Sequence, residues 1–334
     1  MKAIIYEGAN TVSVSEKEIP EIREGWALIK TSHVGICGTD LNIFAGAHPR
    51  ATAPLVMGHE FSGYIAAGHP TLQEGTRVTV NPLLTCGTCT PCVTGQSHVC
   101  ETLKLVGIDC DGAMAEYVLA PIDRILPLSA DLSIKLAALM EPVAVAVHAA
   151  RQGVYIPGDS VVVFGGGTIG LCVAMTLKCY GATNIMIVEP NQLRIKKIEE
   201  LGFKTINPLT DNVKEKILKN THGVGADFVI DCAGHPSVVP QLTETVKVRG
   251  KIIIVAAYKK PPEVNLLQGM FKELNMSFVR VYTQKDFQLA QDLLETEPAF
   301  EKIITHVLSV EEAQNGFDLL TNASDAIKVM YCFD

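Results

Sequence analysis

The segment VVVFGGGTIG, residues 161–170, carries the strongest indication of the fold of this chain. Its first four residues are apolar and rich in valine, which is typical of a buried strand, and the apolar segment 168–182 that follows is predicted to be a helix. The turn between them satisfies the pattern GxGxxG. Because the amides at a helix N-terminus attract negative charge, a glycine-rich turn in this position predicts a site for the pyrophosphate of a dinucleotide.

Each residue of this turn has an expected task. Gly165 permits the tight turn, Gly167 lets the pyrophosphate approach the backbone, and Gly170 lets the helix pack closely on the strand. Thr168 and Ile169 lie between them at the start of the helix.

An acidic residue completes the dinucleotide pattern. Glu189 ends the next predicted strand, where its carboxylate can accept hydrogen bonds from a ribose hydroxyl and would repel a 2′-phosphate. NAD is therefore favoured over NADP. Arg194, on the following predicted helix, is a mild argument for NADP, since an arginine can hold that phosphate.

Strands and helices alternate outward from this turn, which predicts a parallel, doubly wound sheet. The expected helices cover 168–182, 193–202 and 241–248, and the expected strands cover 161–165, 185–189, 227–234, 251–257 and 276–282.

The first 120 residues have a different pattern, with short strands between turns rich in Gly and Pro, which is typical of an antiparallel barrel. Residues 133–153 then show helical spacing on both sides of Pro142. Near the C-terminus, helices are expected at 286–296 and 310–321, and a closing strand is expected at 326–333.

Composition limits the partners. The 334 residues suggest about two domains, and 28 basic against 36 acidic side chains give a net charge of −8. No Lys/Arg-rich run offers a surface for nucleic acid or an anionic membrane. The N-terminus lacks a signal peptide, and no stretch is apolar enough to span a bilayer, so a cytoplasmic protein with a small-molecule substrate is expected.

Ten cysteines are many for a reducing compartment, where metal binding is a better explanation than disulfides. Cys86, Cys89, Cys92 and Cys100 can place four thiolates around one structural zinc ion. An iron–sulfur cluster is less well matched, because the last spacing is long and no proline follows Cys100. A nucleic-acid-binding zinc ribbon is disfavoured, because residues 81–103 contain neither Lys nor Arg. Four unliganded buried cysteines remain a further alternative.

A second set of potential metal ligands lies in turn-rich segments. Cys37, Thr39 and Asp40 form the segment CGTD, and His59 and Glu60 belong to GHE. Each residue alone is a weak signal, because single cysteines and histidines are common in ordinary cores.

Together these motifs resemble the zinc-dependent medium-chain dehydrogenases, the alcohol and polyol dehydrogenase superfamily, over nearly the whole chain. CGTD, GHE, the CxxCxxC segment, DGAMAEYV, Glu141-Pro142 and GGGTIG follow the family's order. The segments MEPVAVAVHAARQG and AIKVMYCF are most similar to the sorbitol dehydrogenase-like branch. The resemblance implies an α/β chain with a GroES-like antiparallel barrel as catalytic domain, residues 1–146 and 284–334, which includes the zinc lobe 81–103. A Rossmann doubly wound parallel-sheet domain, residues 147–283, would bind NAD.

The resemblance also implies two zinc ions per chain. Cys37 and His59 match ligands of a catalytic zinc, Glu60 is a carboxylate that can ligate it, and Glu141 can bind directly or through the metal's water. Asp40 matches a carboxylate that orients His59.

The family's proton path implies that Thr39 takes the proton of the substrate alcohol. Many members then carry a histidine where this chain has Asn42, which cannot titrate. Either an ordered water or His48 would complete the path, or proton release is slower. Phe44 matches a pocket-lining aromatic residue or an ordinary core residue, and Arg280 matches an arginine near the substrate or the subunit contact, with a surface ion pair as the alternative.

We therefore expect an NAD- and zinc-dependent oxidoreductase that oxidises a secondary hydroxyl of a polyol, sugar acid or vicinal diol, assembled as a homodimer or homotetramer. A threonine-type amino-acid dehydrogenase is the enzymatic alternative, although that branch usually shows Asp-Pro where this chain has Glu141-Pro142. A catalytically idle zinc-binding structural protein is the alternative of another class.

Overall fold

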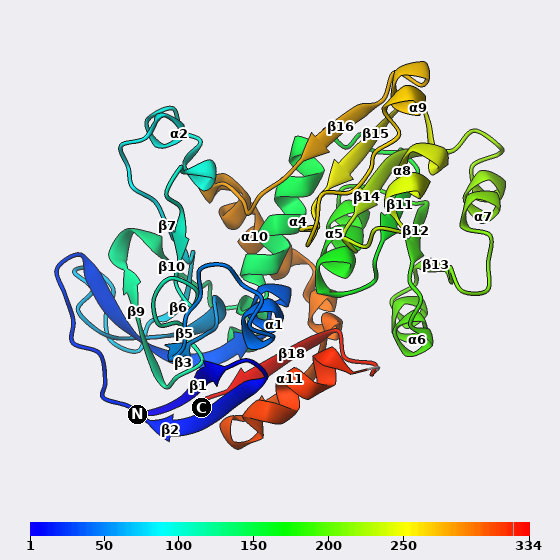
Figure 1. Ribbon diagram of the computed structural model, residues 1–334. Coiled ribbons are helices and arrows are strands. Elements are labelled where there is room, and N and C mark those ends of the chain that lie inside the picture. Colours follow the sequence, from blue (N-terminus) through cyan, green and yellow to red (C-terminus); the bar gives the residue numbers. More distant parts are fainter. Residues whose placement is uncertain (323) are drawn as a thin grey trace. The chain divides into compact units, whose positions relative to one another are not determined.

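The computed structural model describes residues 1–322 and 324–334 (Figure 1). The chain forms two compact units, Met1–Pro142 with Thr283–Asp334, and Val143–Tyr282. Helix α4, Met140–Gln152, carries the chain from the first unit into the second. Among the described residues, no helix combines the length and the apolar character that crossing a bilayer requires.

The second unit is built on a six-stranded parallel sheet with the order β13-β12-β11-β14-β15-β16. The chain moves from β11 outward to β13 and then returns to the other side of β11 at β14. Such a reversal opens a crevice at the carboxyl ends of the two neighbouring strands, where doubly wound sheets bind ligands. The strands are β11 Val161–Phe164, β12 Ile185–Val188, β13 Lys204–Ile206, β14 Ala226–Asp231, β15 Val246–Ile254 and β16 Asn275–Phe278.

Helices connect these strands, as the predicted alternation requires. They are α5 Thr168–Cys179, α6 Gln192–Glu200, α7 Val213–Asn220, α8 Val239–Thr245 and α9 Leu266–Phe271. Strand β11 is fully buried, and Val162 and Phe164 pack in a core with Met186 and Val229 of the flanking strands. A parallel strand that is covered on both faces has no polar side, which explains the unbroken apolar run in β11.

The first unit contains a seven-stranded sheet with the order β10-β6-β5-β3-β18-β17, in which β9 also pairs with β3, and a three-stranded sheet β2-β1-β4. The long strand β3 pairs with β9 over its first half and with β18 at its end. The C-terminal strand β18 therefore completes a sheet begun by N-terminal residues, which makes this unit discontinuous in sequence.

The larger sheet is formed by β3 Trp26–Gly35, β5 Glu60–Ala67, β6 Arg77–Val80, β9 Tyr117–Pro121, β10 Ile125–Pro127, β17 Ile304–Ser309 and β18 Lys328–Cys332. The smaller sheets contain β1 Lys2–Gly8, β2 Thr11–Glu16, β4 Leu55–Val56, β7 Leu83–Leu84 and β8 Lys104–Leu105. The helices are α1 Gly38–Phe44, α2 Thr90–Val93, α3 Ile134–Ala137, α10 Gln284–Thr296 and α11 Ala313–Thr321.

Several predicted elements in the second unit are wrong in their bounds: the strand expected at 251–257 runs from Val246 to Ile254, and the strand expected at 227–234 ends at Asp231. The helix expected at 241–248 ends at Thr245, and β15 begins at Val246, where Lys247 forms an ion pair with Asp227 of β14. The strand expected at 276–282 ends at Phe278. Strand β13 and helix α7 were not expected, because polar residues dominate their short sequences.

Candidate active site and metal centres

The Asp40 carboxylate lies beside Cys37 and His59, the first two candidate zinc ligands. Asp40 lies in the first turn of α1, and its Oδ2 accepts the backbone N–H of Cys37 at 2.8 Å. Its Oδ1 lies 3.6 Å from His59 Nδ1, and each of these two buried atoms lacks a hydrogen-bond partner. Because the unpartnered atoms face each other, Asp40 is placed to orient the His59 ring.

Cys37, His59 and Glu60 meet in one buried cluster. Their ligand atoms, a sulfur, a ring nitrogen and a carboxylate oxygen, all lie within 4.8 Å of one another. Thiolate, imidazole and carboxylate are ligands that zinc accepts, so the donor set fits a zinc ion. The hydroxyl of Thr39 lies 3.8 Å from Cys37 Sγ.

The turn before His59 depends on a glycine. Gly58 has φ +95°, and a Cβ on it would lie 2.8 Å from Val34 and 2.9 Å from Met114. A larger residue would strain the backbone and displace the core, so the local sequence fixes where the chain enters β5 with His59 and Glu60.

Burial and charge act in opposite directions on this cluster. Burial lowers the pKa of His59, but the charges of Asp40 and Cys37 raise it well above its usual value. Burial and the Glu60 carboxylate raise the pKa of the Cys37 thiol. Glu141, which is 7% exposed in the first turn of α4, also raises the His59 pKa by its charge, although it lies outside the three-residue group.

Lys328 is a neighbour of this cluster that the sequence analysis missed. Its Nζ lies 2.5 Å from Glu60 Oε2 and donates to the carbonyl of Ile36 at 2.8 Å. The signal was visible in the closing strand, where one lysine stands among apolar residues. A lysine inside a buried strand must have an acidic or carbonyl partner, because an unpaired buried charge is costly.

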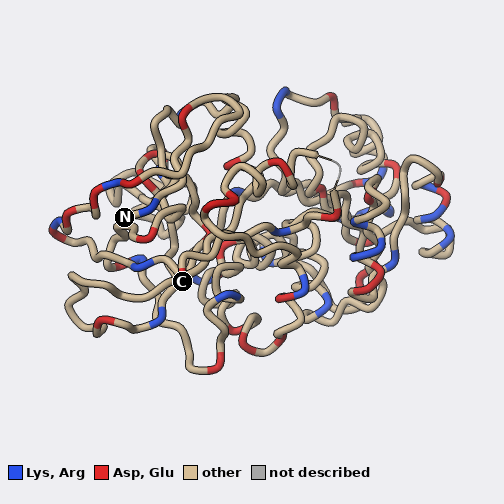
Figure 2. The backbone as a smooth tube through the Cα atoms, turned by 90° about the horizontal axis from the view of Figure 1, so that it is seen from below, with Lys and Arg blue, Asp and Glu red and all other residues tan. Residues whose placement is uncertain are grey.

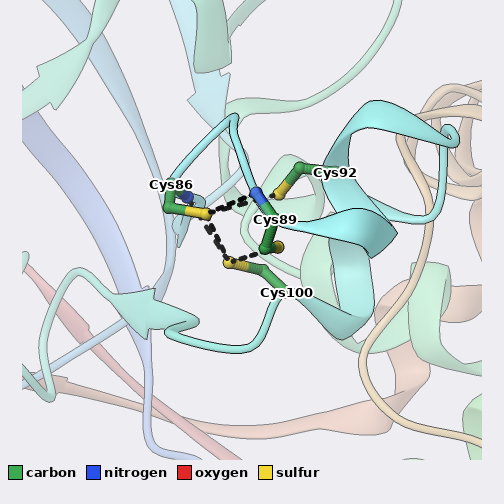
Figure 3. Close-up of side chains that lie close together, drawn as sticks. All are labelled: Cys86, Cys89, Cys92 and Cys100. Carbon is green, nitrogen blue, oxygen red and sulfur yellow. Dashed lines mark hydrogen bonds between the residues drawn. The ribbon is translucent and has the colours of Figure 1, made fainter.

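The four cysteines of the lobe converge, as Figure 3 shows. Three of the Sγ–Sγ distances are 3.9 Å for Cys86–Cys92, 3.8 Å for Cys89–Cys100 and 3.6 Å for Cys86–Cys100. Zinc–sulfur bonds of 2.3 Å in a tetrahedron give sulfur–sulfur separations of about 3.8 Å. The lobe therefore fits a structural zinc ion.

Hydrogen bonds prepare this lobe for a cation. Donors from Thr88 and Cys89 lower the pKa of the Cys86 thiol to about 5, whereas desolvation and neighbouring sulfurs raise that of Cys92 to about 12. Thiolates this close repel one another unless a cation lies among them, so one bound metal ion would remove this repulsion.

The second unit holds a cavity of about 590 Å³ at the carboxyl ends of β11, β12 and β14. Glu189 is 4% exposed, and its carboxylate accepts the backbone N–H groups of Gly166 and Asn191 at 2.8 and 2.9 Å. A carboxylate has about four lone-pair sites, so two remain for ribose hydroxyls. The lining includes Gly165, Gly167, Glu189 and Arg194.

The glycines of the turn have the properties that a pyrophosphate site needs. Gly165 has φ +96°, and a Cβ on Gly170 would lie 1.8 Å from the Gly165 carbonyl oxygen. Gly167, immediately before α5, has no atom within 4 Å of an added Cβ, so its surroundings are open. Thr168 and Ile169 are half-buried at the start of α5. These features fit a dinucleotide.

Four other predicted residues belong to none of these groups of potential ligands. The ring nitrogen Nδ1 of His48 accepts backbone N–H groups of Arg50 and Ala51, at 3.3 and 3.2 Å. Phe44 is a buried core residue that stacks on Phe317, with ring centroids 4.7 Å apart. Asn42 and Arg280 are exposed.

Two family models match the chain, the alcohol dehydrogenase GroES-like domain over residues 23–130 and the zinc-binding dehydrogenase model over residues 168–296. The chain is 34% identical to 2-dehydro-3-deoxy-L-galactonate 5-dehydrogenase of Pseudoalteromonas atlantica, over 88% of this chain and 87% of that protein. It is 33% identical to L-threonine 3-dehydrogenase of Bacillus velezensis, over 96% and 95% of the two chains. It is 31% identical to sorbitol dehydrogenase of Halalkalibacterium halodurans, over 99% and 98%.

A solved structure with the same fold is the alcohol dehydrogenase rspB of Escherichia coli CFT073 in complex with NADH. It superposes with a TM-score of 0.92 at 30% identity and covers 100% of this chain and 99% of that one. These matches confirm the predicted fold class, a GroES-like domain together with a Rossmann-type domain. The chain belongs to the zinc-dependent medium-chain alcohol dehydrogenase superfamily, a family of zinc-binding dehydrogenases that use a nicotinamide dinucleotide.

Proposed function

We propose that this protein oxidises a secondary hydroxyl of a polyol, sugar acid or vicinal diol to a ketone, with NAD as the oxidant. The unit Met1–Pro142 with Thr283–Asp334 is the catalytic domain, and Val143–Tyr282 binds the cofactor. The observation that carries the proposal is the buried cluster of Cys37, His59 and Glu60, in which a mixed set of ligands faces one point.

Cys37, His59 and Glu60 hold the catalytic zinc, and Asp40 orients His59. Bound zinc supplies a Lewis acid that lowers the pKa of a substrate hydroxyl. Glu141 adds a negative charge beside His59, either as a further ligand or through water. Two carboxylates in place of a second thiolate favour harder, exchangeable oxygen donors, which suits a substrate with adjacent hydroxyls.

The Thr39 hydroxyl accepts the proton of the substrate hydroxyl and passes it on, because a hydroxyl can both donate and accept. Water completes the path at Asn42. His48 is the less favoured terminus, since its Nδ1 already accepts two backbone N–H groups and burial lowers its pKa.

NAD binds to the glycine turn, where Gly165 and Gly170 shape the backbone, Gly167 leaves room for the pyrophosphate and α5 directs its first amides toward it. NAD held at this turn would supply the hydride acceptor for the oxidation of the substrate carbon. Glu189 binds the adenosine ribose and disfavours a 2′-phosphate, and its two amide contacts keep the carboxylate in place. Arg194 lies in the lining of the same cavity.

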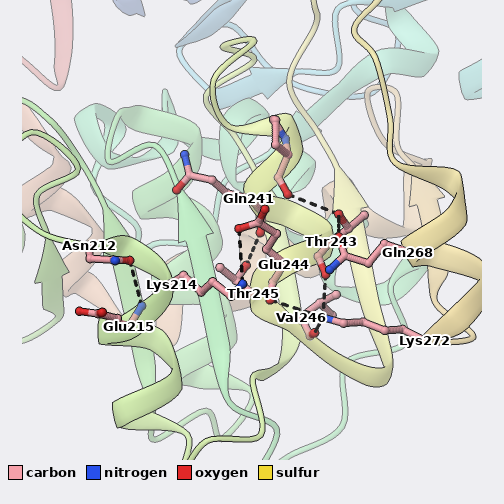
Figure 4. Close-up of polar contacts among 11 residues, drawn as sticks. Asn212, Lys214, Glu215, Gln241, Thr243, Glu244, Thr245, Val246, Gln268 and Lys272 are labelled. Carbon is pink, nitrogen blue, oxygen red and sulfur yellow. Dashed lines mark hydrogen bonds and ion pairs between the residues drawn. The ribbon is translucent and has the colours of Figure 1, made fainter.

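The exposed edge of the second unit supports assembly into a homodimer or homotetramer. Strand β16 is the last strand of the sheet, and Phe278 in it, with Leu266 and Phe271 of α9, is more than 70% exposed. Lys272 donates to the carbonyls of Thr243 and Val246, both at 2.7 Å, and so ties α9 to the end of α8 (Figure 4). An exposed apolar edge that is held in place in this way can pair with a second copy of the chain.

Two broader features support a small-molecule enzyme of a reducing compartment such as the cytoplasm. The four cysteines of the lobe lie together as potential zinc ligands, and such a use of thiols is typical of a reducing compartment. In Figure 2 the basic and acidic positions are interspersed along the tube, which offers little to a polyanion.

The test is NADH formation by zinc-loaded protein over sugar alcohols, sugar acids, butanediol and L-threonine, with NAD or NADP. We expect turnover with at least one polyhydroxylated substrate and NAD. Turnover confined to threonine would support the second candidate, which the 33% identical relative favours. No turnover with both metals bound would contradict the proposal and favour a structural protein.

A further inference from the structure

A third group of metal-ligand side chains lies on strands β3 and β18, outside the two clusters assigned above. His33, Cys332 and Asp334 each offer a ligand atom, and these atoms lie within 4.8 Å of one another. All three residues belong to the first unit. The proposed dehydrogenase reaction uses none of them.

The sheet register brings these side chains together. His33 and Cys332 are direct partners in the antiparallel pair of β3 and β18, so their side chains lie on one face. The pairing continues past β18, because the N–H of Phe333 donates to the carbonyl of Ser32 at 2.8 Å. Asp334, two residues after Cys332, therefore returns to the same face.

A bulge in β3 adds a fourth polar group. The register between β3 and β5 shifts between Thr31 and His33, so Ser32 is an extra residue. The Ser32 hydroxyl lies 2.9 Å from His33 Nδ1 and donates to Asp334 Oδ2. This fully buried hydroxyl joins the imidazole to the carboxylate and holds both in place.

The donor types and charges of the group suit a cation. His33 is 9% exposed, and an imidazole nitrogen is a common ligand of zinc. A thiolate and a carboxylate would balance the charge of a divalent ion. Lys135 is the nearby cation that opposes binding, and Glu301 neutralises it in an ion pair of 2.5 Å.

We propose that His33, Cys332 and Asp334 form a third, exchangeable site for zinc or a similar divalent transition metal. Three protein ligands leave the fourth position of a tetrahedron to water, so this site binds more weakly than the four-cysteine lobe. A metal here fastens β3 to β18. The same strand pair leads to Cys37 at the end of β3 and carries Lys328 at the start of β18.

The test adds one equivalent of cobalt(II) to the zinc-loaded, full-length protein and records the thiolate-to-cobalt absorption band in the near ultraviolet. We expect the band in the wild type and in the control Cys179→Ser, whose cysteine is exposed in the second unit. Cys332→Ser should abolish it. Asp334→Asn, at an exposed position, should weaken cobalt binding at least tenfold without affecting folding.

Zinc provides a second readout. Micromolar zinc should raise the Tm of the wild type and of Cys179→Ser, but not that of Asp334→Asn. The proposal is overturned if the wild-type protein shows no cobalt band. It is also overturned if the band persists in Cys332→Ser, because cobalt has then replaced a resident zinc ion.

Discussion

The Nζ atom of Lys328 lies 2.5 Å from Glu60 Oε2, and both side chains are 1% exposed. The same ammonium group donates to the Ile36 carbonyl, one residue before Cys37. One strand from the C-terminal end of the chain thus neutralises a candidate zinc ligand and fixes the backbone next to another. The free energy of folding and the assembly of the metal site depend on the same contact.

Replacing Lys328 by Met should destabilise the protein by about 3–5 kcal/mol, because it leaves the Glu60 carboxylate buried without its partner. Urea unfolding measures this loss in protein whose catalytic cluster has been stripped of zinc, because a bound metal ion would itself compensate the Glu60 charge. The double variant Lys328→Met/Glu60→Gln should recover part of it, since no unpaired charge then remains.

A surface ion pair provides the matched control. Lys2 and Glu311 are 50% and 63% exposed, so Lys2→Met should lower the free energy of unfolding far less than Lys328→Met does. Equal losses in the free energy of unfolding for Lys2→Met and Lys328→Met would show that burial of the Lys328–Glu60 pair contributes nothing to stability.

Asp40→Asn should weaken zinc binding at the catalytic cluster by about 10–100-fold, because the ring of His59 loses its charged partner. The asparagine oxygen can still accept the Cys37 N–H, so the fold should persist. Metal content after dialysis against a chelator should fall from about two to about one zinc per chain. If Asp40→Asn keeps both zinc ions under conditions that remove one from a His59→Ala variant, Asp40 does not support His59 in binding zinc.

The parts of the fold that depend mainly on residues close together in the sequence were predicted correctly. The strand at 161–165, the glycine turn and the helix after it were predicted correctly, because burial on both faces leaves an apolar run and the turn needs glycine. The end of α8 was wrong. Residues 246–248 belong to β15, because Val246 pairs with Ala226 of β14, and that partner is remote in sequence.

The same distinction holds for the site. Cys37, His59 and Glu60 were predicted from motifs and do converge. Lys328 was missed because its partner lies far away in sequence, and only the pairing of β18 with β3 brings it to the cluster.

Glu189→Gln should raise the KM for NAD about tenfold and leave kcat nearly unchanged, because the loss of a charge-assisted hydrogen bond affects binding of the ribose. The ratio of activity with NADP to activity with NAD should rise, since the negative charge that opposes the 2′-phosphate is removed. Initial rates with both cofactors measure this. A wild type that uses NADP as well as NAD would contradict the role of Glu189.

Cys100→Ser should remove the zinc ion of the lobe, since Cys100 is the buried member of the four and lies near two of the other sulfurs. Zinc content should fall by about one per chain, and the Tm should fall with it. Cys110→Ser, a change outside the cluster, should keep the metal content of the wild type. Unchanged zinc in Cys100→Ser would remove the lobe as a metal site.

Asp227 should make the stability of the second unit depend on pH in the acid range. Burial raises its pKa, but hydrogen bonds from Lys247 and Ser160 outweigh burial and hold the pKa below its usual value of 3.8. The charged form therefore stabilises the fold at pH values above about 4, and this contribution is lost as the pH falls through the folded-state pKa.

Asp227→Asn should cost about 1 kcal/mol at pH 7, a modest value because the side chain is 22% exposed and solvent screens it. Urea unfolding at pH 3 to 7 should show that the gap between wild type and variant is constant above about pH 5 and narrows below pH 4. A gap that stays constant down to pH 3 would mean that the carboxylate charge plays no part, because only a group whose pKa differs between the folded and unfolded states can change stability with pH.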